Sequence, residues 1–184
     1  IARRMAQAGW RVRVAVRRPN EAIFVKPYGT VGQVEPIGCN IRDDASVSAA
    51  LSGADAVVNC VGILNQVGHN KFLDVQAEGA ARIARLASEH GVSNLVHISA
   101  IGADENGPSA YSVTKAHGEA AIQEHFPNAV ILRPSIIFGP KNSFSIASRK
   151  WSPRLPYLQF QGPTGKSHLV TVMVLAVRLF LVPW

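Results

Sequence analysis

Carboxylates are absent from both ends of this sequence. The first 18 residues contain six arginines and neither aspartate nor glutamate, and residues 141–184 contain six lysines or arginines and again no carboxylate. Residues 19–140 hold the remaining 7 basic side chains and all 12 acidic ones, so the net charge of +7 arises at the ends. Nucleic-acid-binding domains usually gather their basic residues on one face of the folded core. This distribution argues against nucleic acid as a partner.

Cysteine is rare, and its two positions form no recognisable motif. Cys39 and Cys60 lie in or beside separate predicted strands, without a C-x-x-C pair. They are typical of small buried apolar residues in a reducing compartment, which favours a cytoplasmic location. The six histidines follow no metal-ligand spacing, so no metal site is predicted.

No apolar run is long enough to cross a bilayer. The longest, residues 169–182, covers 14 positions, whereas a transmembrane helix needs about 20. Contact between this segment and a membrane surface remains an open but disfavoured alternative.

Strand-like and helix-like patterns alternate along the first 140 residues. The predicted strands cover residues 10–16, 30–37, 55–62, 95–99 and 129–134, and the predicted helices cover residues 1–8, 43–51, 72–90 and 109–125. Strands separated by helices of this length are joined by right-handed crossovers, which place the strands parallel. The sequence therefore predicts an α/β fold with a parallel sheet covered on both faces.

The sequence changes character near Phe144. Residues 145–184 have no clear periodicity at first and no carboxylate at all, which is unusual for the surface of a folded domain. We therefore expect one domain over residues 1–144, followed by an irregular tail over 145–184 that a shifted reading frame or truncated gene would explain. The chain also opens within a helical pattern, so the domain is expected to be truncated at its N-terminus.

Three side chains suggest acid–base chemistry. Tyr111 and Lys115 are four residues apart in a predicted helix and so share one face. A nearby ammonium lowers the pKa of a phenol, which would let Tyr111 exchange a proton. Ser99 ends a predicted buried strand, at the sheet edge where ligands bind in open α/β folds. The alternative roles are an ordinary helix surface for the pair and a backbone hydrogen bond for the serine.

Four motifs in this order resemble one enzyme family. They are Val57-Val-Asn-Cys-Val-Gly62, His97-Ile-Ser-Ala-Ile-Gly102, Tyr111-x-x-x-Lys115 and Leu132-Arg-Pro-x-x-x-x-Gly-Pro140. The chain resembles atypical or extended short-chain dehydrogenases/reductases of the NAD(P)-dependent epimerase/dehydratase type. Within that superfamily, the wording around Tyr111 and Arg133 is similar to bacterial relatives of the nucleotide-binding accessory subunit of respiratory complex I.

The resemblance implies a Rossmann-like doubly wound parallel sheet. In that family a strand and a glycine-rich turn come first and hold the cofactor pyrophosphate at a helix N-terminus. This chain is expected to begin after that point and to lack the first strand and the glycine-rich loop. It would then hold a dinucleotide less tightly than a complete domain.

The family also implies roles for individual residues. Ser99, Tyr111 and Lys115 would be catalytic, with Tyr111 and Lys115 also contacting the nicotinamide ribose; Ala100 occupies a position where many members have a second hydroxyl. The expected cofactor-binding residues are Arg17, Arg18, Asn40, Ile41, Val61, Gly62, Tyr111, Lys115 and Pro134.

The choice of cofactor depends on the end of the second strand of the family. An acidic residue there accepts the ribose hydroxyls of NAD, whereas arginine accommodates the 2′-phosphate of NADP. Arg17 and Arg18 occupy this position, which favours NADP(H), with NAD(H) as the alternative. Asp43 follows the third strand near the expected adenine position, but an aspartate before a helix is more often an N-cap.

Three functions remain open. The favoured one is an NADP(H)-binding accessory or assembly subunit of respiratory complex I, docked to the peripheral arm at the inner face of the bacterial plasma membrane or in the mitochondrial matrix. The second is an active NAD(P)-dependent oxidoreductase, epimerase or dehydratase that uses the serine, tyrosine and lysine. The third is a fragment without function.

Overall fold

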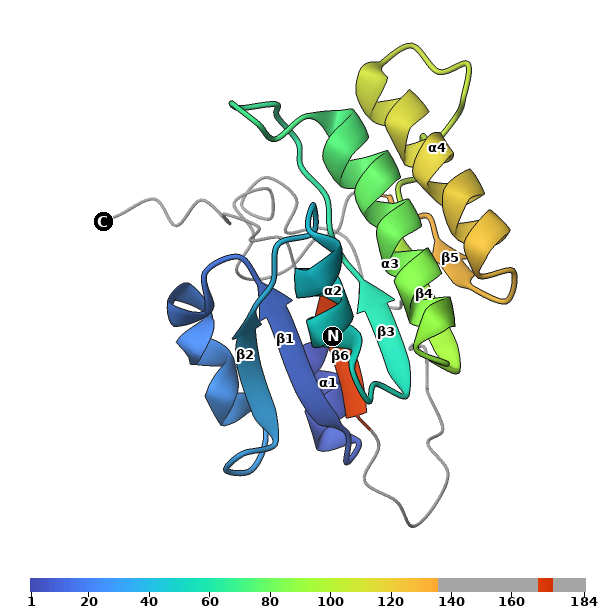
Figure 1. Ribbon diagram of the computed structural model, residues 1–184. Coiled ribbons are helices and arrows are strands. Elements are labelled where there is room, and N and C mark those ends of the chain that lie inside the picture. The colour runs from blue at the N-terminus through green and yellow to red at the C-terminus, as the bar shows by residue number, and fades with distance from the viewer. Residues whose placement is uncertain (136–168, 174–184) are drawn as a thin grey trace, which may run out of the picture.

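Six parallel strands form a single sheet in the computed structural model, which describes residues 1–135 and 169–173 (Figure 1). The spatial order is β2-β1-β6-β3-β4-β5, and every neighbouring pair runs parallel. The strands are β1 (Arg11–Val16), β2 (Val34–Gly38), β3 (Ala56–Asn59), β4 (Asn94–Ile98), β5 (Val130–Leu132) and β6 (Leu169–Met173). The predicted α/β class with a parallel sheet is confirmed.

The central position of the sheet is filled from the tail. Strand β6 pairs with β1 from Arg11↔Leu169 onward and with β3 from Ala56↔Val170 onward, so it separates these two strands. The prediction of an irregular tail is wrong for residues 169–173, and the sheet has no gap where the missing first strand was expected. The backbone groups of β1 and β3 that face this position need partners. The segment Leu-Val-Thr-Val-Met, which contains three β-branched residues, supplies them. The other tail residues lie outside the described part of the chain.

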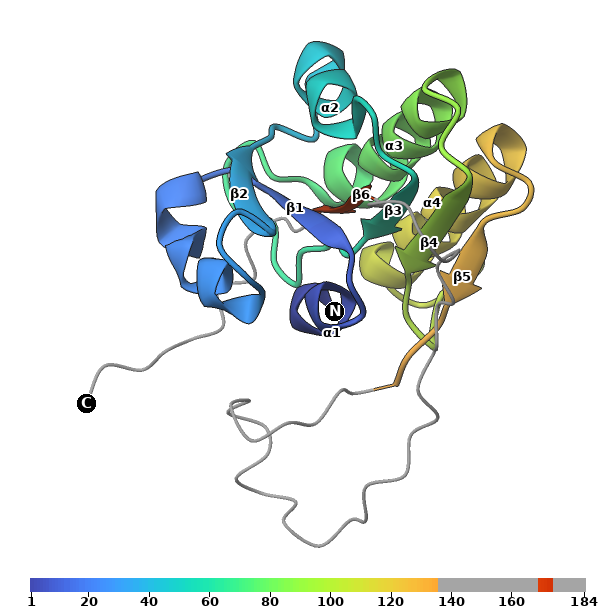
Figure 2. The same cartoon turned by 90° about the horizontal axis from the view of Figure 1, so that it is seen from below.

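Helices cover the sheet on both faces (Figure 2). The helices α2 (Asp44–Leu51), α3 (Glu78–Glu89) and α4 (Ala110–His125) lie on one face, and α1 (Ala2–Gln7) and the 3₁₀-helical segment η1 (Pro19–Tyr28) lie on the other side. Alternate residues of β1, β3 and β4 therefore enter two separate apolar clusters. Val57 of β3 packs on the α2–α4 face, and its neighbour Val58 packs on the α1 face.

The caps of the helices agree with the sequence. Asp43 accepts a hydrogen bond from the backbone N–H of Ala45, which confirms its role as the N-cap of α2. Ser109 caps α4 in the same way by accepting from the N–H of Ser112. The segment η1 was not predicted, because a proline-containing 3₁₀ stretch has no helical apolar period. No helix in residues 1–135 has the length and apolarity to cross a bilayer.

A π-helical turn, η2 (Leu73–Ala77), precedes α3 where the sequence predicts one continuous α-helix. Its residue Gln76 is buried and donates from Nε2 to the backbone oxygen of Ile63 at 2.8 Å. The same amide accepts from Thr114 Oγ1 of α4 at 3.1 Å. Gln76 therefore ties α4 to the loop that follows β3, and this fixes how α4 presents its side chains to the sheet edge.

Candidate active site

The carboxyl ends of the strands place the predicted site residues along one edge of the sheet. Arg17 follows β1, Gly62 follows β3, Ser99 follows β4, and Pro134 follows β5. Helix α4 brings Tyr111 and Lys115 to the same edge from above β4. The structure thus gathers residues that are more than 100 positions apart in the sequence, as parallel strand order requires.

Lys115 is buried against the ends of β3 and β4. Its residue is 4% exposed, and Nζ donates a hydrogen bond to the backbone oxygen of Ile98 at 3.3 Å. A methyl group placed on Gly62 would lie 3.4 Å from the same Nζ, so the glycine leaves the ammonium just enough room. Burial lowers the pKa of Lys115, while the charges of Glu119 and Cys60 act in the opposite direction.

Tyr111 lies one helical turn before Lys115 but has a different environment. Its ring packs edge-to-face on Phe72, with centroids 5.8 Å apart and planes at 83°. Burial raises the pKa of the phenol above its usual value. The sequence predicts the opposite direction, because it assumes that the ammonium lies beside the phenol. In the structure Lys115 Nζ is instead directed to Ile98, and desolvation of Tyr111 dominates.

Ser99 is enclosed by the protein. The residue is 5% exposed and its Oγ is buried. No group in the described part of the chain forms a hydrogen bond with that oxygen. The Ser99 hydroxyl is nevertheless close enough to the carboxyl of Glu119 to help lower its pKa. The hydroxyl therefore faces α4 and the protein interior, and it is not open to a molecule at the sheet edge.

A buried amide–imidazole pair joins the ends of β3 and β4 beside the site. Asn59 Oδ1 accepts from the N–H of Val61 at 3.0 Å, so Asn59 Nδ2 is the donor to Nδ1 of His97, also at 3.0 Å. This arrangement leaves the proton of a neutral His97 on Nε2, which has no partner among the described residues. Burial and the charge of Lys115 lower the pKa of His97 to about 4, so the ring is neutral at physiological pH.

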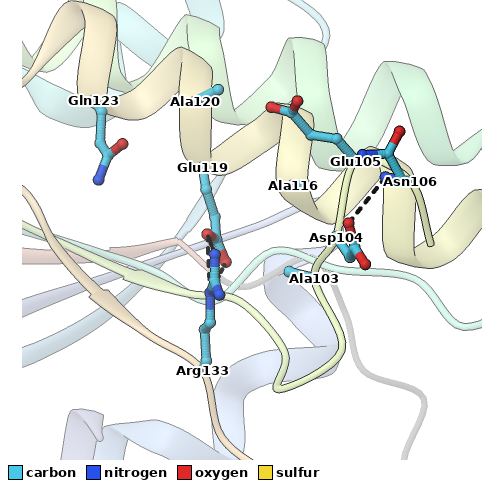
Figure 3. Close-up of a pocket in the computed structure, with 9 residues that line it drawn as sticks. All are labelled: Ala103, Asp104, Glu105, Asn106, Ala116, Glu119, Ala120, Gln123 and Arg133. Atoms are coloured by element: carbon cyan, nitrogen blue, oxygen red, sulfur yellow. Dashed lines mark hydrogen bonds and ion pairs between the residues drawn. The ribbon is translucent and has the colours of Figure 1, made fainter.

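An ion pair joins α4 to the segment that follows β5. Arg133, which follows β5, donates from Nε to both oxygens of Glu119, at 2.9 and 3.0 Å, and from Nη2 to Oε2. Figure 3 shows the two side chains facing each other between α4 and the end of β5. They line a cavity of about 340 Å³ together with residues 103–106 and the outer face of α4. Ser99, Tyr111 and Lys115 are not among the residues that line it.

The residues expected around the adenosine end have different exposures. Arg17 and Arg18 are exposed at the end of β1: Arg17 donates to Asn70 Oδ1 at 3.3 Å, and Arg18 pairs with Glu21 at 2.9 Å. Asn40 is exposed after β2 and accepts from the N–H of Arg42. Ile41 is 3% exposed and packs in the core near Gly79, so only its backbone is placed to meet a ligand.

The residues predicted to bind the cofactor present different groups along this edge. Arg17 and Arg18 expose guanidinium groups, which are suited to binding phosphate, and Gly62 lies against the Lys115 ammonium. Val61 is buried and its N–H donates to Asn59 Oδ1, while the oxygen of Pro134 accepts from the N–H of Ile101.

Several residues in this site were missed by sequence reasoning. His97 and Arg133 lie inside the motifs given above but were assigned no role, and Glu119 and Gln76 were not considered. The spacing of four between Lys115 and Glu119 was the available signal, because it places both on one helix face. The contacts with β4 and β5 needed the tertiary structure.

Metal and disulfide chemistry find no support in residues 1–135. No group of three or more His, Cys, Asp or Glu side chains there is arranged to hold a metal ion. Cys39 and Cys60 are both free thiols, and burial raises the pKa of Cys60 to about 11. A thiol with such a pKa is a poor nucleophile at neutral pH.

Comparison with known protein families identifies the domain. A family described as NAD(P)H-binding matches residues 1–144. The NADH dehydrogenase [ubiquinone] 1 alpha subcomplex subunit 9, mitochondrial, of Dictyostelium discoideum is 34% identical over 155 residues, which are 84% of this chain and 43% of that protein. The ceramide reductase of Caulobacter vibrioides is 27% identical over 179 residues, which are 97% of this chain and 55% of the reductase.

The fold has a counterpart among solved structures. A putative NAD-dependent epimerase/dehydratase from Bacillus halodurans superposes with a TM-score of 0.65 at 20% identity, over 77% of this chain and 66% of that one. At this identity the similarity shows the fold alone. The chain spans about half the length of the two curated relatives named above.

Proposed function

We propose that this chain, which belongs to the NAD(P)H-binding family, binds NADP(H) without catalysing hydride transfer and acts as an accessory or assembly subunit of respiratory complex I. The enclosed hydroxyl of Ser99 is the observation that carries the non-catalytic part. A catalytic serine must reach the oxygen of a substrate within about 3.2 Å. Ser99 Oγ is instead shut off from the sheet edge and lies near Glu119.

Two further features support binding without turnover. Ala100 follows Ser99 and offers no second hydroxyl. The pKa of Tyr111 is raised by burial, so the phenol holds its proton more firmly than a free tyrosine does. An effective acid or base at neutral pH needs the opposite shift.

Preference for NADP(H) follows from the two arginines at the end of β1. Both side chains are exposed; Arg17 donates to an amide oxygen of Asn70, whereas Arg18 is paired with Glu21. A guanidinium can bind a phosphate monoester in a bidentate manner, and Arg17 can do so without breaking an ion pair with a carboxylate. The ribose of NAD offers no such charge, so its binding gains less from these residues.

The assignment to complex I is supported by the similarity to a subunit of NADH dehydrogenase. In that role the protein would lie at the inner face of a bacterial plasma membrane or in the mitochondrial matrix. A tagged chain expressed in a bacterium that makes the complex should comigrate with its peripheral arm on native gels. If the tagged chain migrates only as a free protein, the assignment to complex I is wrong.

Binding and catalysis are tested together by titration and turnover. NADPH and NADH are titrated into the purified chain by calorimetry, and NADPH oxidation is followed with a panel of aldehydes and ketones. We expect NADPH to bind more tightly than NADH, with no NADPH oxidation by wild type or by Tyr111→Phe. Failure to bind either nucleotide would support the alternative of a fragment without function.

Oxidoreductase activity is the second candidate. It is favoured by the match to a ceramide reductase over 97% of the chain and by Tyr111 and Lys115 on one helix. In that case the panel would reveal NADPH oxidation, and Tyr111→Phe would abolish it. The substrate carbonyl would then depend on a group other than Ser99 for its orientation.

A further inference from the structure

Glu119 is a buried carboxylate at a point where α4 meets the ends of β4 and β5. Its residue is 6% exposed on α4, one helical turn beyond Lys115. Arg133 after β5 donates from Nε to both oxygens and from Nη2 to one of them, and Ser99 after β4 and His97 of β4 help to lower the pKa of the carboxyl. Burying a carboxylate without partners is energetically costly. The several partners of Glu119 therefore indicate that its side chain keeps its negative charge.

The two cationic side chains near Glu119 differ in their exposure to solvent. Arg133 is half exposed, with 53% of its side chain accessible, whereas Lys115 on the other side is almost fully enclosed. The Lys115 ammonium donates its hydrogen bond to a neutral backbone oxygen. Burial favours the neutral amine, and a nearby negative charge opposes this. The carboxylate of Glu119, one helical turn along the same face of α4, acts in that direction.

We propose that Glu119 is a positioning residue for Lys115: its carboxylate keeps the ammonium charged and directed at the end of β4, where the nicotinamide ribose of the cofactor is expected. Only the link to the cofactor ribose rests on the proposed binding of NADP(H); the effect of Glu119 on the Lys115 ammonium does not. The Glu119–Arg133 pair spans α4 and the end of β5, so it also sets the distance of α4 from the sheet edge. The cavity shown in Figure 3 gives solvent access to the arginine side of the pair.

Other charged or titratable groups face Lys115 from each element around it. The thiol of Cys60 lies at the end of β3 and the ring of His97 lies on β4. Tyr111 precedes Lys115 on α4. Since the thiol and the imidazole are neutral at pH 7, Glu119 supplies the counter-charge.

The direct test is the titration of Lys115 in the full chain. The protein is labelled with [ε-¹³C]lysine, the Lys115 resonance is identified by its loss in Lys115→Met, and its titration is followed by NMR. We expect Glu119→Gln to move the titration midpoint to lower pH, because the carboxylate no longer favours the charged amine. A looser helix would expose the amine to water and move the midpoint to higher pH, so the direction separates positioning from packing.

Two variants complete the experiment. Arg133→Gln breaks the same ion pair but keeps the carboxylate, so it should not lower the midpoint. Glu124→Gln removes an exposed charge from the same helix and serves as the matched control. An unchanged or raised midpoint in folded Glu119→Gln overturns the proposal; if that variant does not fold, a lowered midpoint in Arg133→Gln overturns it.

Binding adds a readout that keeps the two proposals apart. At pH 8 the affinity of Glu119→Gln for NADPH should fall by roughly three- to tenfold, as expected for one displaced nearby charge. If no variant or wild-type protein binds NADPH, the proposed function fails, but the NMR midpoints still decide the role of Glu119. If NADPH binds equally well to wild type and Glu119→Gln despite a lowered midpoint, the link to the cofactor is wrong.

Discussion

Asn59 and His97 lie on adjacent parallel strands and share a hydrogen bond of 3.0 Å beneath the site. The side chains of both residues are 1% exposed. Because Asn59 Oδ1 is occupied by the N–H of Val61, the amide can only donate to the ring. The pair thus holds His97 in its neutral form and fixes the start of the loop that leads to Gly62.

Acid should destabilise the protein through His97. Its pKa is about 4 in the folded protein and about 6.5 in the unfolded chain, so between these pH values only the unfolded chain binds the proton. The free energy of unfolding should therefore fall by roughly 3 kcal/mol between pH 7 and pH 4 on account of this residue. Urea denaturation at both pH values measures it. His97→Gln should reduce the loss by that amount, whereas the exposed His117→Gln should leave it unchanged.

Arg17→Asp should weaken NADPH binding much more than NADH binding. A guanidinium–phosphate contact contributes about 1.5–3 kcal/mol, so the affinity for NADPH should fall by roughly 10- to 100-fold. Calorimetry with both nucleotides measures the change in selectivity. The same charge reversal at Arg11, which opens β1 at the opposite edge of the sheet, is the control. An equal loss of NADPH and NADH affinity would remove the arginines from the selection of the cofactor.

Gly118→Ala should destabilise the fold. An added Cβ would lie 2.3 Å from the backbone oxygen of Gln76, and neither the helix nor the π-helical turn can move without breaking the contacts of Gln76. Overpacking of this kind costs about 1–3 kcal/mol. Chemical denaturation measures the loss. Gly102→Ala meets no atom within 4 Å and should have little effect, so similar stabilities of the two variants would contradict the close packing of α4.

Thr171→Pro tests the central strand. Residue 171 pairs with Arg13 of β1 and with Val57 of β3, and a proline there removes an N–H from the middle of the sheet. The free energy of unfolding should fall by about 3 kcal/mol or more. Thr171→Ala keeps the backbone donor and should be much closer to wild type. If the two variants unfold at the same denaturant concentration, β6 is not part of the folded sheet in solution.

Much of the candidate site could be read from the sequence, but its chemistry could not. The order of strands and helices placed Ser99, Tyr111 and Lys115 at one edge, as observed. The direction of the Lys115 ammonium depends on the backbone oxygen of Ile98, and the enclosure of Ser99 depends on Glu119 from another element. Neither contact has a local signal. The roles assigned to these residues therefore stay predictions until the variants are measured.

The sequence alone determined the local elements, because caps, apolar periods and turn residues act over a few neighbouring positions. Asp43 and Ser109 begin their helices as expected, and the apolar strands follow one another in parallel as their helical connections require. Only the tertiary structure decided that Leu169–Met173 enters the centre of the sheet, since that pairing joins residues more than 150 positions apart. It also decided the charge environment of Lys115 and Tyr111, because burial and contacts between elements, not spacing along α4, set the pKa of each group.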